Sequence, residues 1–393
     1  MHTLSIMLTL AGALLLAGLL TDELGRRTPL PRVTLQLLLG AAIGPWLAEL
    51  APEIEHTWFP GIAQIALAMV GFLLGERLQV GVLRAHGRIV LCTSVSVVIV
   101  TLGLVAVGLF ALGVPLALAL VIGAIATATA PAATQDTVRE VSADGPFSRT
   151  LLEIVALDDA WGLIAFSVML ALAVGLCGDG AGTDVLLVGA RELGGALLLG
   201  AAIGVPAALL SGRIRPGEPT LVEALGIVLL CSGIGLWLDI SVLLAAMVLG
   251  AVVANLARHH TRPFHAIEQI EWPFMILFFV FAGASLHLAE LRAVGWLAGA
   301  YVGLRVAGRL LGGWIGARIG AADAPTRRWI GAALMPQAGV ALGMALVVQR
   351  RYPELGASVL PLVIASTVLF EITGPVLTRF VLVRVGEAAP RGS

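Results

Sequence analysis

Long apolar runs follow one another along almost the whole chain, and only short segments with glycine, proline or charge separate them. A helix needs about 20 apolar residues to cross the ~30 Å hydrocarbon core of a bilayer. Runs of about that length or longer lie at 2–20, 30–50, 60–78, 87–112, 115–140, 147–178, 184–212, 220–238, 240–257, 268–288, 292–318, 327–349 and 357–383. We therefore expect an all-α polytopic protein of the lipid bilayer, with about thirteen transmembrane helices.

The composition supports this class and excludes a water-soluble enzyme. Hydrophobic residues make up 59% of the 393 residues and charged residues only 12%, whereas soluble proteins carry about 25% charged residues. The run at Leu4–Leu20 follows no lysine or arginine. Because secretory signal peptides begin with a basic segment, we expect this run to be retained as the first helix.

Charge and cysteine usage also exclude some partners. The net charge of −1 provides no field that would attract nucleic acid. The three cysteines lie far apart, without the spacing of a metal site or a disulfide framework. We expect no nucleic-acid partner and no cofactor.

The placement of arginine predicts the orientation in the membrane. All 24 basic residues are arginine. If successive connecting segments face alternate sides, 18 arginines fall on one side and 3 on the other, and the remaining three, Arg191, Arg305 and Arg309, lie inside the runs. Because basic residues favour the cytoplasmic side, we expect a cell-membrane protein with its C-terminus inside and its N-terminus outside, which requires an odd number of crossings.

Proline interrupts two of the apolar runs near their middles. Pro131 lies within Thr127–Thr134, and Pro336 lies within Met335–Gly339. The two runs are seven apart, so they cross in opposite directions, as expected for an inverted-topology repeat. Paired interrupted helices indicate a transporter site; two ordinary proline kinks packed against neighbouring helices are the alternative.

Two adjacent carboxylates, Asp158 and Asp159, lie inside the run at 147–178. Carboxylates within a membrane are costly and usually functional. Asp158, Arg309 and the two prolines each lie about 14–16 Å from the predicted cytoplasmic ends of their runs, at 1.5 Å per helical residue. This common depth near the middle of the membrane predicts that they meet at one site.

The expected chemistry at this site is competition between a cation and a proton. Carboxylate and backbone carbonyl oxygens suit a dehydrated alkali cation, and a broken helix frees such carbonyls. Adjacent helical residues point about 100° apart, so one aspartate can face Arg309 and the other a water-filled cavity. A buried ion-pair network that only holds the helices together is the alternative.

Other charges within the runs are weaker candidates. Glu153 lies five residues before Asp158 on a different helix face, which favours a structural role. Glu371, in the last run, is either a group on the ion pathway or a partner of Arg305.

The segments that carry these residues resemble the second branch of the monovalent cation:proton antiporters, within the cation–proton antiporter superfamily. The resemblance covers nearly the whole chain and is carried, in order, by Thr127–Thr134, Ala156–Leu163, Phe278–Leu286, Gly308–Gly313 and Leu334–Leu342. It implies two crossed broken helices beside the aspartate pair, a homodimer and an elevator-like motion.

The resemblance also implies roles for single residues. Asp159 would be the main carrier of ion and proton, Asp158 would pair with Arg309, and Thr129 would lie beside the ion. Thr127 and Gln337, in the two interrupted segments, are further candidates.

The same resemblance implies a division of the chain. A dimer domain would comprise 1–80 and 220–288, and a core domain would comprise 86–178 and 292–385. A linker helix at 184–212 would join them.

We predict a secondary antiporter, not an enzyme, that exchanges protons for Na⁺, with Li⁺ or K⁺ as alternatives. A Na⁺-coupled carrier of an organic anion with the same fold is a second hypothesis, and only Arg305 and Arg309 would suit its substrate. An intramembrane aspartyl protease is a third, but it needs two carboxylates that share a proton, and adjacent aspartates diverge.

The number of protons per cation depends on the aspartate pair. Two-aspartate members that resemble this chain typically move two protons per Na⁺. Because Arg309 keeps its proton, Asp158 and Asp159 would then carry both, and we predict electrogenic exchange. If Asp158 is instead locked to Arg309, only Asp159 cycles and exchange is electroneutral.

Overall fold

The computed structural model describes residues 2–27, 32–50, 59–81, 87–177, 182–210, 220–257, 261–284, 295–337 and 339–388. Throughout these ranges the regular structure is helical, which confirms the predicted class. The chain divides into two compact units, Met1–Val80 with Ala190–Leu288 and Gly81–Gly189 with Ala289–Ser393.

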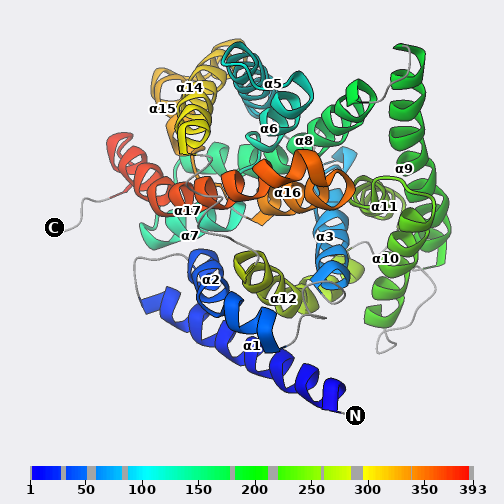
Figure 1. Ribbon diagram of the computed structural model, residues 1–393. Helices are drawn as coiled ribbons and strands as arrows, with labels where there is room; N and C mark the ends of the chain where they lie inside the picture. Colours follow the sequence, from blue (N-terminus) through cyan, green and yellow to red (C-terminus); the bar gives the residue numbers. More distant parts are fainter. Residues whose placement is uncertain are drawn as a thin grey trace. The chain divides into compact units, whose positions relative to one another are not determined.

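The first unit is a bundle of long helices. Its elements are α1 (His2–Arg27), α2 (Arg32–Leu50), α3 (Phe59–Glu76), α9 (Gly182–Leu210) from residue 190 onward, α10 (Thr220–Trp237), α11 (Val242–Leu256) and α12 (Thr261–Ala284). Helix α12 packs against α1, α2, α3 and α10, and α3 packs closely on α11 (Figure 1). Gly75 and Gly250 face each other where α3 meets α11, so the absence of side chains lets the backbones approach.

The second unit contains both proline interruptions. Its elements are α5 (Arg88–Ala111), α6 (Leu116–Ile125), α7 (Pro131–Glu140), α8 (Pro146–Cys177), α14 (Gly295–Ile319), α15 (Ala324–Ala333), α16 (Gly339–Arg351) and α17 (Pro353–Arg384). Helix α14 lies along α5 and α15 (Figure 1). Three glycines at intervals of four residues, at positions 308, 312 and 316, form the face of α14 that meets α5, and Gly320 directly after the helix continues this series against Ile89.

A helix, or two short helices with a break between them, occupies each of the thirteen apolar runs. Among the described residues, four helices are both long and apolar enough to cross a membrane, at Arg88–Ala111, Pro146–Leu176, Arg262–Ala284 and Ser358–Arg384. The count of thirteen crossings and the inverted repeat stay predictions.

Both interrupted runs are broken helices. The first break separates Ile125, the end of α6, from Pro131, the start of α7. Proline suits the first position of a helix because that position needs no N–H donor. The second break separates Ala333, the end of α15, from Gly339, the start of α16; Ala338 lies outside the described residues.

A glycine on a long neighbouring helix makes room for each break. A Cβ atom added to Gly162 of α8 would lie 2.9 Å from the Thr127 Oγ1 in the first break. A Cβ atom added to Gly374 of α17 would lie 2.6 Å from the Cα of Pro336 in the second break. The long helices therefore approach the irregular backbone more closely than any larger residue would permit.

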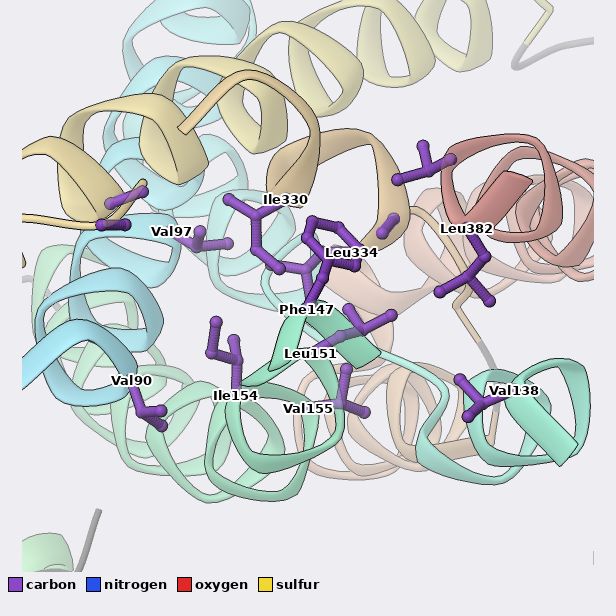
Figure 2. Packing of buried hydrophobic residues seen from close by; sticks show 14 of the residues in the cluster. Val90, Val97, Val138, Phe147, Leu151, Ile154, Val155, Ile330, Leu334 and Leu382 are labelled. Carbon is purple, nitrogen blue, oxygen red and sulfur yellow. The ribbon is translucent and has the colours of Figure 1, made fainter. Parts of the chain in front are cut away.

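An apolar cluster joins the ends of the helices that surround the breaks. It lies among α5, α7, α8, α15 and α17 (Figure 2), and its fully buried members include Val97, Leu151, Ile154 and Ile330. Within a membrane protein, close packing of such side chains stabilises the contacts between helices through van der Waals interactions. The cluster extends along α8 as far as Leu157, directly before the two aspartates.

The start of α8 is also held by the segment that follows α17. The Glu387 carboxylate accepts hydrogen bonds from the backbone N–H groups of Phe147 (2.7 Å) and Ser148 (2.8 Å). An acidic side chain at a helix N-terminus satisfies free N–H groups and interacts favourably with the helix dipole. The two contacts therefore anchor the helix that carries the aspartates.

Candidate functional site

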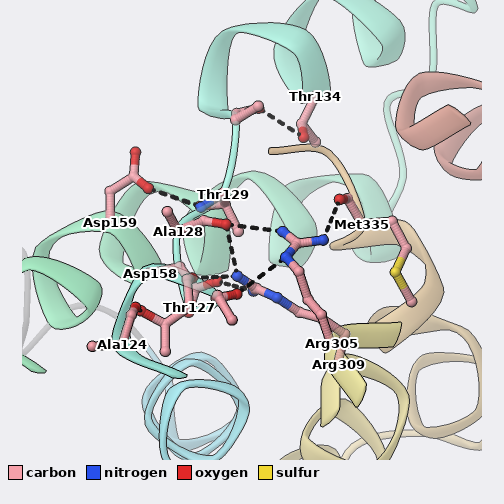
Figure 3. A network of polar contacts seen from close by, with 12 residues as sticks. Ala124, Thr127, Ala128, Thr129, Thr134, Asp158, Asp159, Arg305, Arg309 and Met335 are labelled. Carbon is pink, nitrogen blue, oxygen red and sulfur yellow. Dashed lines mark hydrogen bonds and ion pairs between the residues drawn. The ribbon is translucent and has the colours of Figure 1, made fainter. Parts of the chain in front are cut away.

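Asp158 and Asp159 lie on α8 and are 0% and 1% exposed. Their side chains point to different partners, as expected for adjacent residues on a helix. Asp158 faces Arg309 of α14, whereas Asp159 faces Thr129 in the first break (Figure 3). The structure therefore brings together the aspartates, Arg309 and Thr129.

Asp159 is held by the irregular backbone of the first break. Its Oδ1 accepts hydrogen bonds from the Thr129 backbone N–H and from the Thr129 hydroxyl, both at 3.1 Å. The N–H is available because Thr129 lies between the two short helices and makes no helical bond there. These two donors fix the orientation of the carboxylate.

Asp158 and Arg309 form a fully buried ion pair. The Arg309 Nη1 lies 2.5 Å from the Asp158 Oδ2, and both side chains are 0% exposed. The Arg309 Nη2 also donates to the carbonyl oxygens of Thr127 and Ala128, the latter at 3.0 Å. Among the described residues, the Asp158 Oδ1 and the Arg309 Nε have no hydrogen-bond partner.

Arg305, one turn before Arg309 on α14, contacts both breaks. In the first break, its Nε donates to the Ala126 carbonyl at 3.1 Å and its Nη2 to the Ala128 carbonyl at 2.9 Å. In the second break, its Nη1 donates to the Met335 carbonyl at 3.0 Å. The guanidinium carbon also lies 4.2 Å from the centre of the Phe370 ring, which adds a cation–π contact.

These contacts revise the expected use of the freed carbonyls. We expected carbonyl oxygens of the broken helices to be ligands for the cation, but in the structure those of Ala126, Thr127, Ala128 and Met335 accept hydrogen bonds from arginine. The C-terminal ends of short helices carry partial negative charge. Two arginines, which keep their protons, match that charge.

The remaining candidates differ in their surroundings. The Thr127 hydroxyl donates to the Ala124 carbonyl of its own helix at 2.6 Å. The Gln337 Nε2 donates to the Tyr301 hydroxyl at 3.1 Å, in the second break. Glu371 is buried on α17, directly after the phenylalanine that contacts Arg305. Glu153 is exposed on α8 and so lies apart from the buried aspartates.

The sequence led to no prediction for Tyr301, and it led to only two for Arg305, a contact with Glu371 or with an organic anion. Tyr301, Arg305 and Arg309 are spaced by four residues, so they share one face of α14, and all three are 0% exposed. That spacing was visible in the sequence. It would have indicated a polar face of α14 directed at both breaks.

Comparison with known proteins identifies the family. The family model described as "Sodium/hydrogen exchanger, transmembrane" matches residues 11–383. A relative named as an ammonium/H⁺ antiporter subunit, from Alkalihalophilus pseudofirmus, is 24% identical over 282 residues, which are 71% of this chain and 70% of the relative.

The fold is also found in a solved structure. The sodium proton antiporter MjNhaP1 from Methanocaldococcus jannaschii matches with a TM-score of 0.72 and 20% identity, over 98% of this chain and 97% of that one. The resemblance inferred from the sequence is thereby confirmed. The chain belongs to the transmembrane sodium/hydrogen exchanger family and is a secondary transporter, a cation:proton antiporter.

Proposed function

We propose that this chain exchanges protons for Na⁺ and that Asp159 carries both ions in turn. The observation that supports this role is the contrast between the two aspartates. Asp158 is paired with Arg309, whereas Asp159 contacts only neutral donors of Thr129 among its hydrogen-bond partners in the described residues. A buried carboxylate without a permanent counter-ion needs a cation or a proton.

The residues around Asp159 suggest how binding alternates. An ionised Asp159 offers carboxylate oxygens, and the Thr129 hydroxyl offers a further oxygen for a hard monovalent cation. A proton on Asp159 removes the charge that attracts the cation. Because one carboxylate serves both ions, binding of one requires release of the other.

The fixed ion pair supports one-for-one exchange. Asp158 remains matched to a guanidinium that does not release its proton. Only Asp159 then changes its proton or cation occupancy during the cycle. We therefore propose electroneutral exchange, in place of the electrogenic exchange that the family resemblance suggests.

The distribution of the site residues between the two units supports a different role for each unit. Both aspartates, both arginines and both breaks belong to the unit formed by 81–189 and 289–393. We propose that this unit is the transport core, that the other unit forms a homodimer interface, and that the core moves in an elevator-like manner in the cell membrane.

The two alternative functions have less support. The donors of Arg305 and Arg309 go to protein carbonyls and to Asp158, which leaves little for an organic anion. Asp158 and Asp159 face different partners, which does not suit a pair of carboxylates that share a proton.

Proton flux in proteoliposomes tests the proposal. Vesicles with an internal pH dye would receive Na⁺, Li⁺, K⁺ or ammonium, and protein-free vesicles would control for the passage of neutral ammonia. We expect exchange by the wild type and loss of exchange in Asp159→Asn. Asp136→Asn, which changes an exposed aspartate of α7, is the matched control. Cation-dependent proton flux that survives in Asp159→Asn would refute the assignment.

A further inference from the structure

Arg305 connects two segments that are far apart in the sequence. Its Nε and Nη2 reach the first break and its Nη1 reaches the second, so one rigid guanidinium group spans both. The side chain is 0% exposed, and Phe370 covers it. Since the guanidinium is planar and its donors are fixed in a fork, the two breaks are held at a defined separation.

Most carbonyl oxygens of the first break accept hydrogen bonds from donors within the protein. Those of Ala126 and Ala128 accept from Arg305, and that of Thr127 accepts from Arg309. The Ala130 carbonyl accepts from the backbone N–H and the hydroxyl of Thr134, both at 3.1 Å. Four carbonyls of this break therefore have donors within the protein.

We propose that Arg305 is a positioning residue that ties the two helix breaks together and keeps their carbonyl oxygens from coordinating the transported cation. This inference rests on the proposed exchange at Asp159. The cation is then bound by the Asp159 carboxylate and the Thr129 hydroxyl, and water completes its coordination.

This arrangement has a consequence for cation selectivity. Water adapts to ions of different radius, so a site completed by water discriminates weakly among Li⁺, Na⁺ and K⁺. Carbonyl dipoles held by protein discriminate through their number and field strength. Removing the Arg305 fork frees the carbonyls of Ala126 and Met335 and should favour the larger cations, which lose their water more readily.

Arginine and lysine variants separate the charge of this side chain from its bridging role. A lysine at this position keeps the positive charge, but its ammonium is a compact group without a planar fork. It therefore cannot reproduce three contacts that are distributed over two breaks. Arg305→Gln removes the charge as well.

The experiment measures KM and kcat for Li⁺, Na⁺ and K⁺ with purified protein in proteoliposomes. The variants are Arg305→Lys and Arg305→Gln. Arg318→Lys and Arg318→Gln are matched controls, because Arg318 is exposed near the end of the same helix. We expect both Arg305 variants to lower the ratio of KM for K⁺ to KM for Li⁺ by about threefold or more, and the controls to keep the wild-type ratio.

A purely structural role would lower kcat and the melting temperature without changing the ratio of KM values. If Arg305→Lys keeps the wild-type ratio, the inference is wrong; this variant also decides the question if Arg305→Gln does not fold. Failure of the proposed function has a different signature, namely no exchange by the wild type or persistent exchange in Asp159→Asn. Wild-type exchange that Asp159→Asn abolishes, together with an unchanged ratio in Arg305→Lys, refutes the role of Arg305 alone.

Discussion

The Asp158–Arg309 pair should be strongly coupled in stability, with unequal effects of removing its two members. Removing one partner of a buried ion pair typically costs about 3–5 kcal/mol, because the other charge is left without compensation. Arg309→Gln leaves Asp158 in this state, and it also removes a donor from the carbonyls of Thr127 and Ala128. We therefore expect a cost near the upper end of that range.

Asp158→Asn should cost less. The remaining Arg309 keeps its contacts with two backbone carbonyls, and the new amide oxygen can still accept a hydrogen bond. The double variant Asp158→Asn/Arg309→Gln leaves neither charge unpaired. It should therefore be more stable than the sum of the two single effects predicts.

Melting temperatures of the four proteins in one detergent measure this coupling. A loss of about 3 kcal/mol corresponds to about 6 °C or more for a unit of this size. From the double-mutant cycle we expect the double variant to be about 1–3 kcal/mol more stable than the sum of the two single effects predicts. Additive effects within about 0.5 kcal/mol would show that the two side chains do not stabilise each other. That result would refute the fixed ion pair of the proposed mechanism.

Three further predictions concern packing, helix anchoring and charge movement. A Cβ at Gly316 would lie 2.6 Å from the Thr93 Cα, so Gly316→Ala should destabilise the protein by about 1–3 kcal/mol; Gly303→Ala, with open space around it, should be neutral or stabilising in the same melting assay. Glu387→Gln should lower stability by about 1 kcal/mol through weaker capping of α8. Asp144→Asn should produce no measurable change, because the ion pair of Asp144 with Arg149 is exposed (79% and 69% of the two side chains). Exchange should show no reversal potential under voltage clamp; a shift of about 59 mV for a tenfold Na⁺ gradient without a pH gradient would instead establish two protons per Na⁺.

The positions of the helices were predictable because hydropathy is a local property. The sequence ranges agree with the helices within a few residues at most ends. The two largest differences are at α1, which ends at Arg27 rather than at 20, and at α12, which begins at Thr261 rather than at 268. Hydropathy marks the apolar part of a helix, and polar turns that extend from it have no apolar signal.

The presence of proline alone was not sufficient to locate the breaks. Pro206, Pro273 and Pro361 lie inside continuous helices. The interrupted segments differ because arginine side chains satisfy their carbonyls and a glycine of a neighbouring helix leaves space for them. Those partners come from distant parts of the chain, so a local pattern cannot reveal them.

The candidate site was predictable in its charges but not in its hydrogen bonds. Depth along each helix placed Arg309 at the level of Asp158, and the structure brings the two into contact. The rotation of α14 about its axis decides which carbonyls its side chains reach, and depth gives no information about that rotation. The four-residue spacing of Tyr301, Arg305 and Arg309 would have supplied it.

The fixed charges of the network explain why the proposed exchange is insensitive to membrane potential. In this proposal Arg305 and Arg309 keep their protons and Asp158 stays in the ion pair that the structure contains, so these three charges are the same throughout the cycle. Asp159 gains one positive charge from either Na⁺ or H⁺, which makes the two loaded forms electrically equal. The membrane potential therefore acts equally on the outward and inward movements, and its effects cancel. A residue at position 309 that could release its proton would break this equality, because a second proton would then move in only one of the two directions.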